Sequence, residues 1–258
     1  MVSLVIAIII ILAIVVAALR RNKRSKTVVL PDNTKQLLAD NVDFYNKLSE
    51  ANKLVFENRV RDFLATTAVT GVETEVSELD RLLVASSAII PIFAFPDWRY
   101  KNISEVLLYK GTFNKAYETE GNDRNVLGMV GDGAMHGQMI LSQESLRTGF
   151  SGNHGSHNTA IHEFAHLIDK ADGAVDGVPE YLLNQAHAKP WLQYMHETIS
   201  KMRASGHSDI NLYGATNEAE FFAVVSEYFF EQPDKLQTHH PELYAMLQEM
   251  FQPPKEEI

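Results

Sequence analysis

The chain has 258 residues and is 45% hydrophobic, which is enough for one large domain or two small ones with a real core. It has no cysteine, so disulfides, cysteine-ligated zinc and a cysteine nucleophile are excluded, and any metal must be held by histidines and carboxylates. Outside residues 1–26 the chain carries 18 basic against 33 acidic side chains, and this negative charge argues against nucleic-acid binding.

An apolar run opens the chain from Val2 to Leu19, with Ser3 as its one polar residue. As a helix it would be about 27 Å long, just enough to span the hydrocarbon core of a lipid bilayer. Because a basic cluster follows the run, the positive-inside bias predicts a transmembrane anchor over 1–26 and a cytoplasmic domain over 27–258. A cleavable signal peptide, which would carry its charge ahead of the run, and a helix buried against a partner are the alternatives.

Helices and short strands are predicted to alternate in the body. Apolar residues at three- and four-residue spacings predict helices between about 34 and 66. The apolar stretch from Leu82 to Phe95, with Pro91 and Pro96, predicts a buried helix followed by a short strand. Further strands are predicted at 106–109, 126–130 and 139–142.

The pentapeptide His-Glu-Phe-Ala-His at residues 162–166 has the spacing of half a zinc active site. On a helix, His162 and His166 lie one turn apart on the same face and can bind one metal ion, while Glu163 is free to act as a general base. Other residues of this helix are apolar and share a face that would pack inward: Ile161, Phe164, Ala165 and Ile168. The alternative is two ordinary surface histidines with an acid between them.

A catalytic zinc takes a third protein ligand, for which several residues compete. His154 and His157 lie upstream on a Gly-rich loop. Asp172 lies where a metzincin-type motif would place its third ligand, but Asp169 replaces the glycine which that motif uses for its turn. Glu220 lies in a distant apolar segment and is the stronger candidate, because a carboxylate on so apolar a helix needs a partner.

The segment around Glu220 predicts a helix that is apolar except for one stripe. Glu220, Glu227 and Glu231 fall within about 40° of each other on a helical wheel, with Asn217 nearby, whereas Glu218 points the opposite way. A solvated acidic edge is the simpler interpretation of the same stripe.

Three motifs resemble those of the Mlc titration factor A family, which consists of zinc-dependent, glucose-regulated metallopeptidases. They are His-Glu-Phe-Ala-His-Leu-Ile-Asp at 162–169, Asp-Gly-Val-Pro at 176–179, and the long block at 213–230 that begins Tyr-Gly-Ala-Thr-Asn-Glu-Ala-Glu. The resemblance covers about residues 35–252 and is strongest in the second half of the chain.

The resemblance implies an α+β fold, with a mainly helical zincin-like metallopeptidase domain and a small β-sheet, here preceded by the N-terminal transmembrane helix. It implies one zinc ion per chain and aminopeptidase-like activity on short peptides. The implied zinc ligands and catalytic residues are His162, His166 and Glu220 for the metal, and Glu163 and Tyr213 for catalysis. It also implies, as the alternative function, a regulatory protein that sequesters a transcriptional repressor of the Mlc type.

These assignments predict a mechanism and a location. Glu163 would take a proton from the attacking water and pass it to the leaving amine, and Tyr213 would stabilise the developing oxyanion or, alternatively, only pack at the start of a helix. Asp169 would orient His166 or cap its helix, and Asn217 would support the ligands or cap its own helix. The apolar run and its basic flank place the chain in the inner membrane of a bacterium, with its catalytic domain in the cytoplasm.

Overall fold

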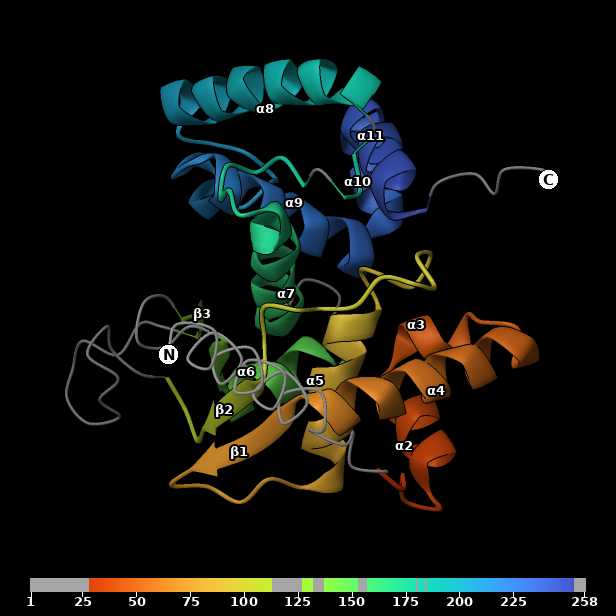
Figure 1. Ribbon diagram of the computed structural model, residues 1–258. Coiled ribbons are helices and arrows are strands. Elements are labelled where there is room, and N and C mark those ends of the chain that lie inside the picture. Colours follow the sequence, from red (N-terminus) through yellow and green to blue (C-terminus); the bar gives the residue numbers. More distant parts are fainter. Residues whose placement is uncertain are drawn as a thin grey trace, which may run out of the picture.

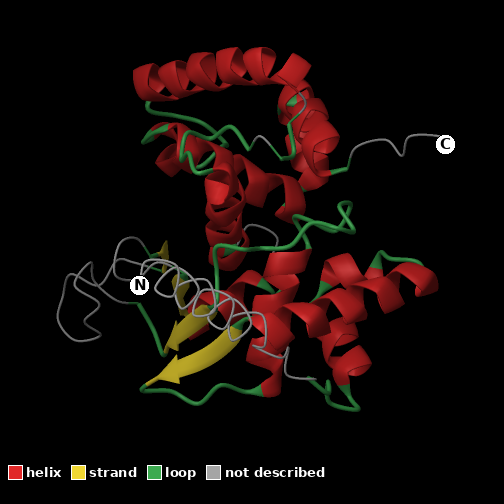
Figure 2. Ribbon diagram, in the orientation of Figure 1, coloured by secondary structure: helices red, strands yellow, loops and turns green. Residues whose placement is uncertain are grey.

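The computed structural model describes residues 28–112, 127–131, 137–152, 157–179, 181–183 and 185–252. Within these ranges the chain is a mainly helical α+β domain with one small mixed sheet (Figures 1 and 2). The strands are β1 (Ala68–Val72), β2 (Glu105–Tyr109), β3 (Gly128–Val130) and β4 (Gln138–Ser142). The helices are α2 (Thr34–Asn41), α3 (Asp43–Asn46), α4 (Glu50–Thr66), α5 (Glu78–Ile89), α6 (Gln143–Gly149), α7 (Thr159–Asp169), η2 (Lys170–Asp172), α8 (Gln185–Ser205), η3 (Leu212–Ala215), α9 (Glu218–Glu231), α10 (Pro233–His239) and α11 (Pro241–Phe251).

The sheet has the strand order β1-β2-β4-β3. β1, β2 and β4 are parallel, and Val106 in the middle of the sheet pairs with Val69 on one side and Met139 on the other. β3 runs antiparallel to β4 and forms one edge of the sheet. This edge lies beside α7, so the sheet supplies one side of the region around the histidine motif.

α5 is the central helix of the core. Its amino end is closed by a capping box between Ser77 and Asp80, and its residues from Leu82 to Ile89 are all buried. The short strand predicted after this helix is wrong. Residues 90–94 form consecutive turns instead, closed by backbone hydrogen bonds such as those from Ile92 to Ile89 and from Phe93 to Ile90, and the buried Arg59 donates hydrogen bonds to the carbonyls of Ile92 and Phe93.

The other predicted elements are largely as expected. The helices predicted between 34 and 66 are confirmed as α2, α3 and α4, and the strands predicted at 106–109 and 139–142 are confirmed as β2 and β4. The strand predicted at 126–130 is confirmed over Gly128–Val130. The predicted transmembrane run at 2–19 lies outside the described residues, and in the described part of the chain no helix is long and apolar enough to cross a membrane.

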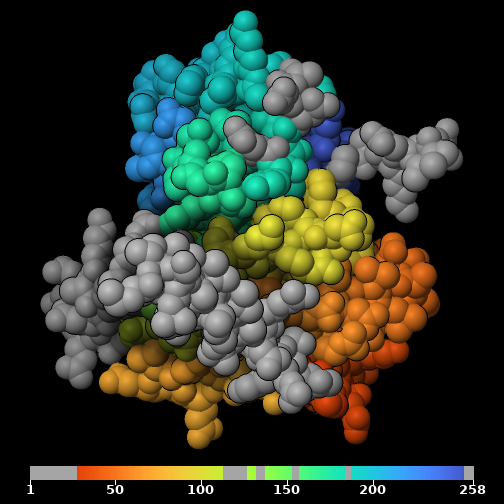
Figure 3. All heavy atoms as spheres, in the orientation of Figure 1, coloured from red at the N-terminus to blue at the C-terminus, as the bar shows by residue number. Residues whose placement is uncertain are grey.

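The helices gather into two groups that meet along α7. Figure 1 shows α2 to α6 with the sheet in the lower half and α8 to α11 in the upper half, with α7 running between them. α9 packs along α7 and is itself buried from Phe221 to Phe229. In the space-filling view the two groups are in close contact, with the yellow stretch near residue 100 beside their junction (Figure 3). The pairing of α7 with α9 therefore joins the two halves and carries the candidate site.

Candidate metal centre

The histidine motif of α7 lies at the edge of the helix that borders the cleft, because the apolar face of the helix is buried in the core. Asn158 caps the helix through its side-chain oxygen, which accepts a hydrogen bond from the backbone N–H of Ile161 at 3.1 Å. The predicted inward face is confirmed, since all four of its residues are buried: Ile161, Phe164, Ala165 and Ile168. His162, Glu163 and His166 then line a cleft of about 630 Å³.

Glu220 reaches the same cleft from the first turn of α9. Asn217 is the N-cap of this helix and accepts a hydrogen bond from the backbone N–H of Glu220 at 2.9 Å. Glu218 lies on another face of α9, where its carboxylate is 3.3 Å from the Nε2 atom of the exposed His196. Because residues two apart point to nearly opposite sides of a helix, Glu220 faces α7 and Glu218 faces α8.

One ligand atom from each of His162, His166 and Glu220 lies within 4.8 Å of the others. The Oε2 atom of Glu220 is 3.1 Å from Nε2 of His162 and 3.3 Å from Nε2 of His166. Ligands at the usual zinc distances of about 2.0–2.1 Å are about 3.4 Å apart in a tetrahedron, so these three donors fit around one zinc ion. A ligand set of two imidazoles and one carboxylate leaves the fourth position open, as a catalytic site requires.

The carboxylates and histidines of the cluster shift each other's pKa values. Burial alone would raise the pKa of Glu220, but hydrogen bonds with His162 and His166 outweigh it and hold that pKa well below its ordinary value. Burial alone would lower the pKa of His162, yet the neighbouring carboxylates of Glu220 and Glu227 raise it to about 10. Without a metal ion, a proton on His162 therefore balances part of the carboxylate charge, and a bound cation would take the place of that proton.

Glu163 is set back from these three donors and is almost fully buried. Burial raises the pKa of its carboxyl group, and the backbone N–H of Val130 on β3 donates a hydrogen bond to it. A carboxylate whose pKa is raised toward neutrality and which faces the cleft is suited to accept and return a proton.

Tyr213, on η3, also lines the cleft. Its hydroxyl donates a hydrogen bond to Oε1 of Glu220 at 3.3 Å, and its ring lies 6.1 Å from that of His162. Burial and the charge of Glu220 raise the pKa of Tyr213, so its hydroxyl remains protonated and available as a donor. About half of the side chain is exposed, so the core does not hold the ring in place.

A second layer of polar residues supports the cluster. Oε2 of Glu227 faces Nδ1 of His162 at 3.6 Å, while its Oε1 accepts hydrogen bonds from the backbone N–H of Asn158 at 2.8 Å and from Nδ1 of His157 at 3.0 Å. Carboxylates in this position fix the ring orientation of a metal-binding histidine. The stripe predicted on α9 thus contains both a candidate ligand, Glu220, and a residue behind the ligands, Glu227.

The remaining candidates from the sequence occupy other positions. His154 lies outside the described residues. Asp172 accepts a hydrogen bond from the backbone N–H of Ala174, and the three-donor cluster does not include it. Asp169 ends α7 and precedes η2, but its side chain makes no cap hydrogen bond there, and no hydrogen bond joins it to His166 among the described residues. Its carboxylate accepts a hydrogen bond from the backbone N–H of Gly177 at 3.1 Å.

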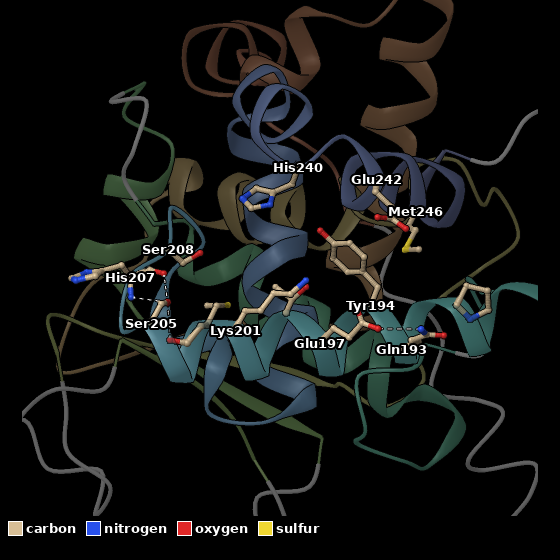
Figure 4. Close-up of a pocket in the computed structure, with 13 residues that line it drawn as sticks. Gln193, Tyr194, Glu197, Lys201, Ser205, His207, Ser208, His240, Glu242 and Met246 are labelled. Carbon is tan, nitrogen blue, oxygen red and sulfur yellow. Dashed lines mark hydrogen bonds between the residues drawn. The ribbon is translucent and has the colours of Figure 1, made fainter.

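A second hollow lies away from these residues. It has a volume of about 420 Å³ and is formed by α8, the loop after it and the start of α11, with Tyr194, Lys201 and Glu242 among its side chains (Figure 4). None of the residues described above lines it. The chemistry of the chain is therefore assigned to the cleft between α7 and α9.

Three contributors to the site had no clear signal in the sequence. Gly128 and Val130 lie on β3, and Asn211 precedes η3. Tertiary packing brings all three to the cleft. In the sequence, the β3 residues lie at least 30 residues before the His-Glu-Phe-Ala-His motif, and Asn211 lies 45 residues after it. Only the seven-residue spacing of Glu220 and Glu227, two turns of one helix, pointed to part of this arrangement.

Residues 16–252 match the family described as "Glucose-regulated metallo-peptidase M90". This match covers more than nine tenths of the chain and includes the three candidate ligands. The chain belongs to the M90 metallopeptidase family. The resemblance drawn from the three sequence motifs is thereby confirmed.

Relatives with similar sequences come from several bacteria. The chain is 30% identical over 234 residues to an uncharacterized protein of Synechocystis sp., an alignment that covers 86% of this chain and 84% of the relative. It is 28% identical over 177 residues to Mlc titration factor A of Pectobacterium atrosepticum, covering 63% and 64% of the two chains. For the Mlc titration factor A of Escherichia fergusonii the identity is 29% over 188 residues, covering 65% and 67%.

Proposed function

We propose that this chain is a zinc-dependent, aminopeptidase-like metallopeptidase that hydrolyses short peptides at the cleft between α7 and α9. The observation that carries the proposal is the convergence of His162, His166 and Glu220, with the buried carboxylate of Glu163 beside them in the same cleft. A structural zinc site would be closed by a fourth protein ligand and would have no use for Glu163.

The three donors would hold one zinc ion, which supplies Lewis-acid chemistry by lowering the pKa of water toward neutrality and polarising a peptide carbonyl. Glu163 accepts the proton of the attacking water as the new C–O bond forms. It then returns this proton to the amine nitrogen as the C–N bond breaks. The hydrogen bond from Val130 holds the Glu163 carboxylate in place for both transfers. Tyr213 donates a hydrogen bond to the oxygen that gains negative charge.

The alternative function is regulatory binding of a transcriptional repressor of the Mlc type. Its support is that several relatives, at 25–29% identity, carry the name Mlc titration factor A. A protein that only binds a repressor has no need of a buried carboxylate beside three metal donors, and this favours the enzyme. The two functions are compatible in one chain.

A location belongs to the same proposal. The apolar run at 2–19 and the basic residues after it make residues 1–26 a single-pass anchor in the inner membrane of a bacterium. Residues 27–258 then form the metallopeptidase domain on the cytoplasmic side. Protease protection of the carboxyl-terminal end in spheroplasts, and its digestion in inverted membrane vesicles, would support this orientation; the reverse pattern would reject it.

Glu163→Gln tests the enzymatic proposal directly. The purified full-length chain should cleave aminoacyl p-nitroanilides, lose this activity to a chelator and recover it with zinc. The variant should keep its zinc by elemental analysis while cleavage falls by about 10²- to 10⁴-fold, the usual contribution of a general base. Glu249→Gln, a change to a half-exposed carboxylate outside the cleft, is the control and should leave turnover unchanged. Unchanged turnover in Glu163→Gln would reject the assignment.

A further inference from the structure

A closed ring of polar contacts surrounds the candidate metal centre. Nδ1 of His162 faces Glu227 at 3.6 Å, Glu227 accepts from Nδ1 of His157 at 3.0 Å, and Nε2 of His157 accepts from the side-chain amide of Asn211 at 3.3 Å. The side-chain oxygen of Asn211 accepts from the backbone N–H of Tyr213 at 2.9 Å. The hydroxyl of Tyr213 reaches Glu220, which returns to His162. His157 therefore connects the two candidate ligand helices to the segment that carries the tyrosine.

His157 has the right chemistry for this connection. Its Nδ1 donates to a carboxylate and its Nε2 accepts from an amide, so both ring nitrogens of one neutral tautomer have partners. The side chain is 61% exposed, and its position is therefore set by these two hydrogen bonds more than by packing.

The segment 211–216, which carries Tyr213, is held on its amino-terminal side by the hydrogen bond between Asn211 and His157. On its carboxyl-terminal side, the guanidinium of Arg203 donates hydrogen bonds to the carbonyl oxygens of Ala215 and Thr216 at 2.7 and 2.9 Å. On the other side Asn211 is exposed, and its side chain bonds to His157. Tyr213 itself is 54% exposed, so its distance from the candidate ligands depends on how these two ends are held.

We propose that His157 is a positioning residue that fixes Tyr213 over the metal centre, by coupling Glu227 behind His162 to Asn211 at the start of η3. The inference rests on the proposed peptidase function for its kinetic consequence, but not for its structural one. A loose tyrosine would still allow substrate and zinc to bind, and would stabilise the transition state less well.

Two replacements of His157 separate its two hydrogen bonds. An asparagine amide overlaps the Nδ1 position, so His157→Asn keeps the bond to Glu227 and loses the bond to Asn211. A glutamine carbonyl reaches the Nε2 position, so His157→Gln keeps the bond to Asn211 and loses the bond to Glu227, which cuts the other half of the coupling. Asn211→Ser retains a good cap for Tyr213 but is too short to reach His157. His196→Asn, on a comparably exposed histidine that pairs with Glu218, is the control.

In the full-length zinc-loaded chain, His157→Asn and Asn211→Ser should each lower kcat about fivefold to tenfold, the effect of one lost hydrogen bond, with KM and zinc content unchanged. The double variant should lose no more than either single variant, because both cut the same contact. His157→Gln should lower kcat as much as His157→Asn does, because the coupling needs both hydrogen bonds, while His196→Asn should stay within about twofold of the parent chain. Parent-level kcat in either His157 variant would overturn the inference, since one of the two hydrogen bonds would then be dispensable and His157 would not couple Glu227 to Asn211.

Hydrogen exchange of the backbone in peptides that cover 211–216 supplies a readout independent of activity. His157→Asn and Asn211→Ser should speed this exchange about fivefold to tenfold while α7 and α9 stay protected. If the parent chain shows no chelator-sensitive cleavage, the peptidase proposal fails and this exchange measurement alone decides the positioning role. Unchanged exchange in both variants would reject it.

Discussion

Gly128 on β3 and Glu163 on α7 lie so close together that a Cβ atom on residue 128 would be 2.7 Å from Cγ of Glu163 and 2.8 Å from its Oε1 atom. The same atom would be 2.8 Å from Cγ2 of Thr159. The edge strand of the sheet thus approaches the proposed general base without a side chain between them. The absence of a side chain at residue 128 allows Val130, two residues along the strand, to donate its hydrogen bond to Glu163.

Gly128→Ala should therefore damage catalysis without removing the metal. Glu163 must move away from the new methyl group, and a misplacement of about 1 Å at a reacting group can lower activity by about 10²-fold. Zinc content should remain at the parent level, since the three atoms nearest to the new Cβ belong to Glu163 and Thr159 and not to the three donors. Gly111→Ala is the control, because the nearest atom to its Cβ would be 3.9 Å away. Equal activity of the two variants would refute the steric argument.

The two acidic residues at the start of α9 should respond differently to substitution. Glu220→Ala removes one of three proposed ligands, and zinc affinity should fall by more than about 100-fold, since even residues behind the ligands contribute 10- to 100-fold. Glu218→Ala, which removes a carboxylate paired with the exposed His196, should leave zinc affinity unchanged. Competition with a chromogenic chelator measures both. If Glu218→Ala loses zinc affinity and Glu220→Ala does not, Glu218 is the ligand and the assignment of Glu220 is wrong.

Local periodicity explains what the sequence predicted well. The apolar face of α7 and the acidic stripe of α9 follow from helical spacing within a single segment, and both are found in the structure. The β1 strand was not predicted, because Ala68–Val72 is short, contains a glycine and has only one buried residue, Val69. Its partner β2 lies more than 30 residues away, and no local pattern records that pairing.

Non-local polar contacts were the other part that the sequence could not predict. His157 was considered only as a loop residue or a metal ligand, whereas its partner Glu227 lies 70 residues further along the chain. Asp169 was expected to serve His166 or to cap a helix, and instead binds the backbone of Gly177. Such contacts depend on how α7, α9 and the loops between them pack, which is decided by the whole core.

Gly177 should tolerate no side chain. Its φ of +73° lies in the left-handed region, and a Cβ atom there would collide with the carbonyl oxygen of Glu218 and lie 3.2 Å from the sulfur of Met195. Its carbonyl also accepts a hydrogen bond from Trp191 Nε1 at 2.7 Å. Gly177→Ala should lower the free energy of unfolding by more than about 2 kcal/mol, through backbone strain and the forced shift of its neighbours.

Gly152→Ala is the matched control for this change. Gly152 has the same φ of +73°, but among the described residues, its chain neighbours aside, no atom lies within 4 Å of the position its Cβ would take. Urea unfolding of both variants separates backbone strain, common to the two, from the collision, which only Gly177 has. A loss of stability that is equal in the two variants would show that the collision is absorbed without cost.

Glu231 at the end of α9 should make stability depend on pH. Burial, together with the charges of Glu227 and Asp43, raises its pKa to about 7, although its carboxylate accepts a hydrogen bond from Asn158 at 2.9 Å. The folded chain therefore keeps this carboxyl protonated up to about pH 7, whereas in the unfolded chain it ionises near its ordinary value. The free energy of unfolding should fall as pH rises between these two values, and the loss should level off above the folded pKa.

Glu231→Gln removes the ionisation and keeps a carbonyl oxygen to accept the hydrogen bond from Asn158. It should stabilise the chain at pH 8 by about 1–3 kcal/mol, and the gain should shrink toward zero below pH 4.5, where the glutamate is protonated in both the folded and the unfolded chain. Urea unfolding at several pH values provides the measurement. Glu249→Gln, which makes the same substitution at a half-exposed glutamate, provides the baseline for the pH dependence. If the variant is more stable by the same amount at every pH, the difference in the free energy of unfolding comes from packing. It does not come from the cost of charging a buried carboxyl group.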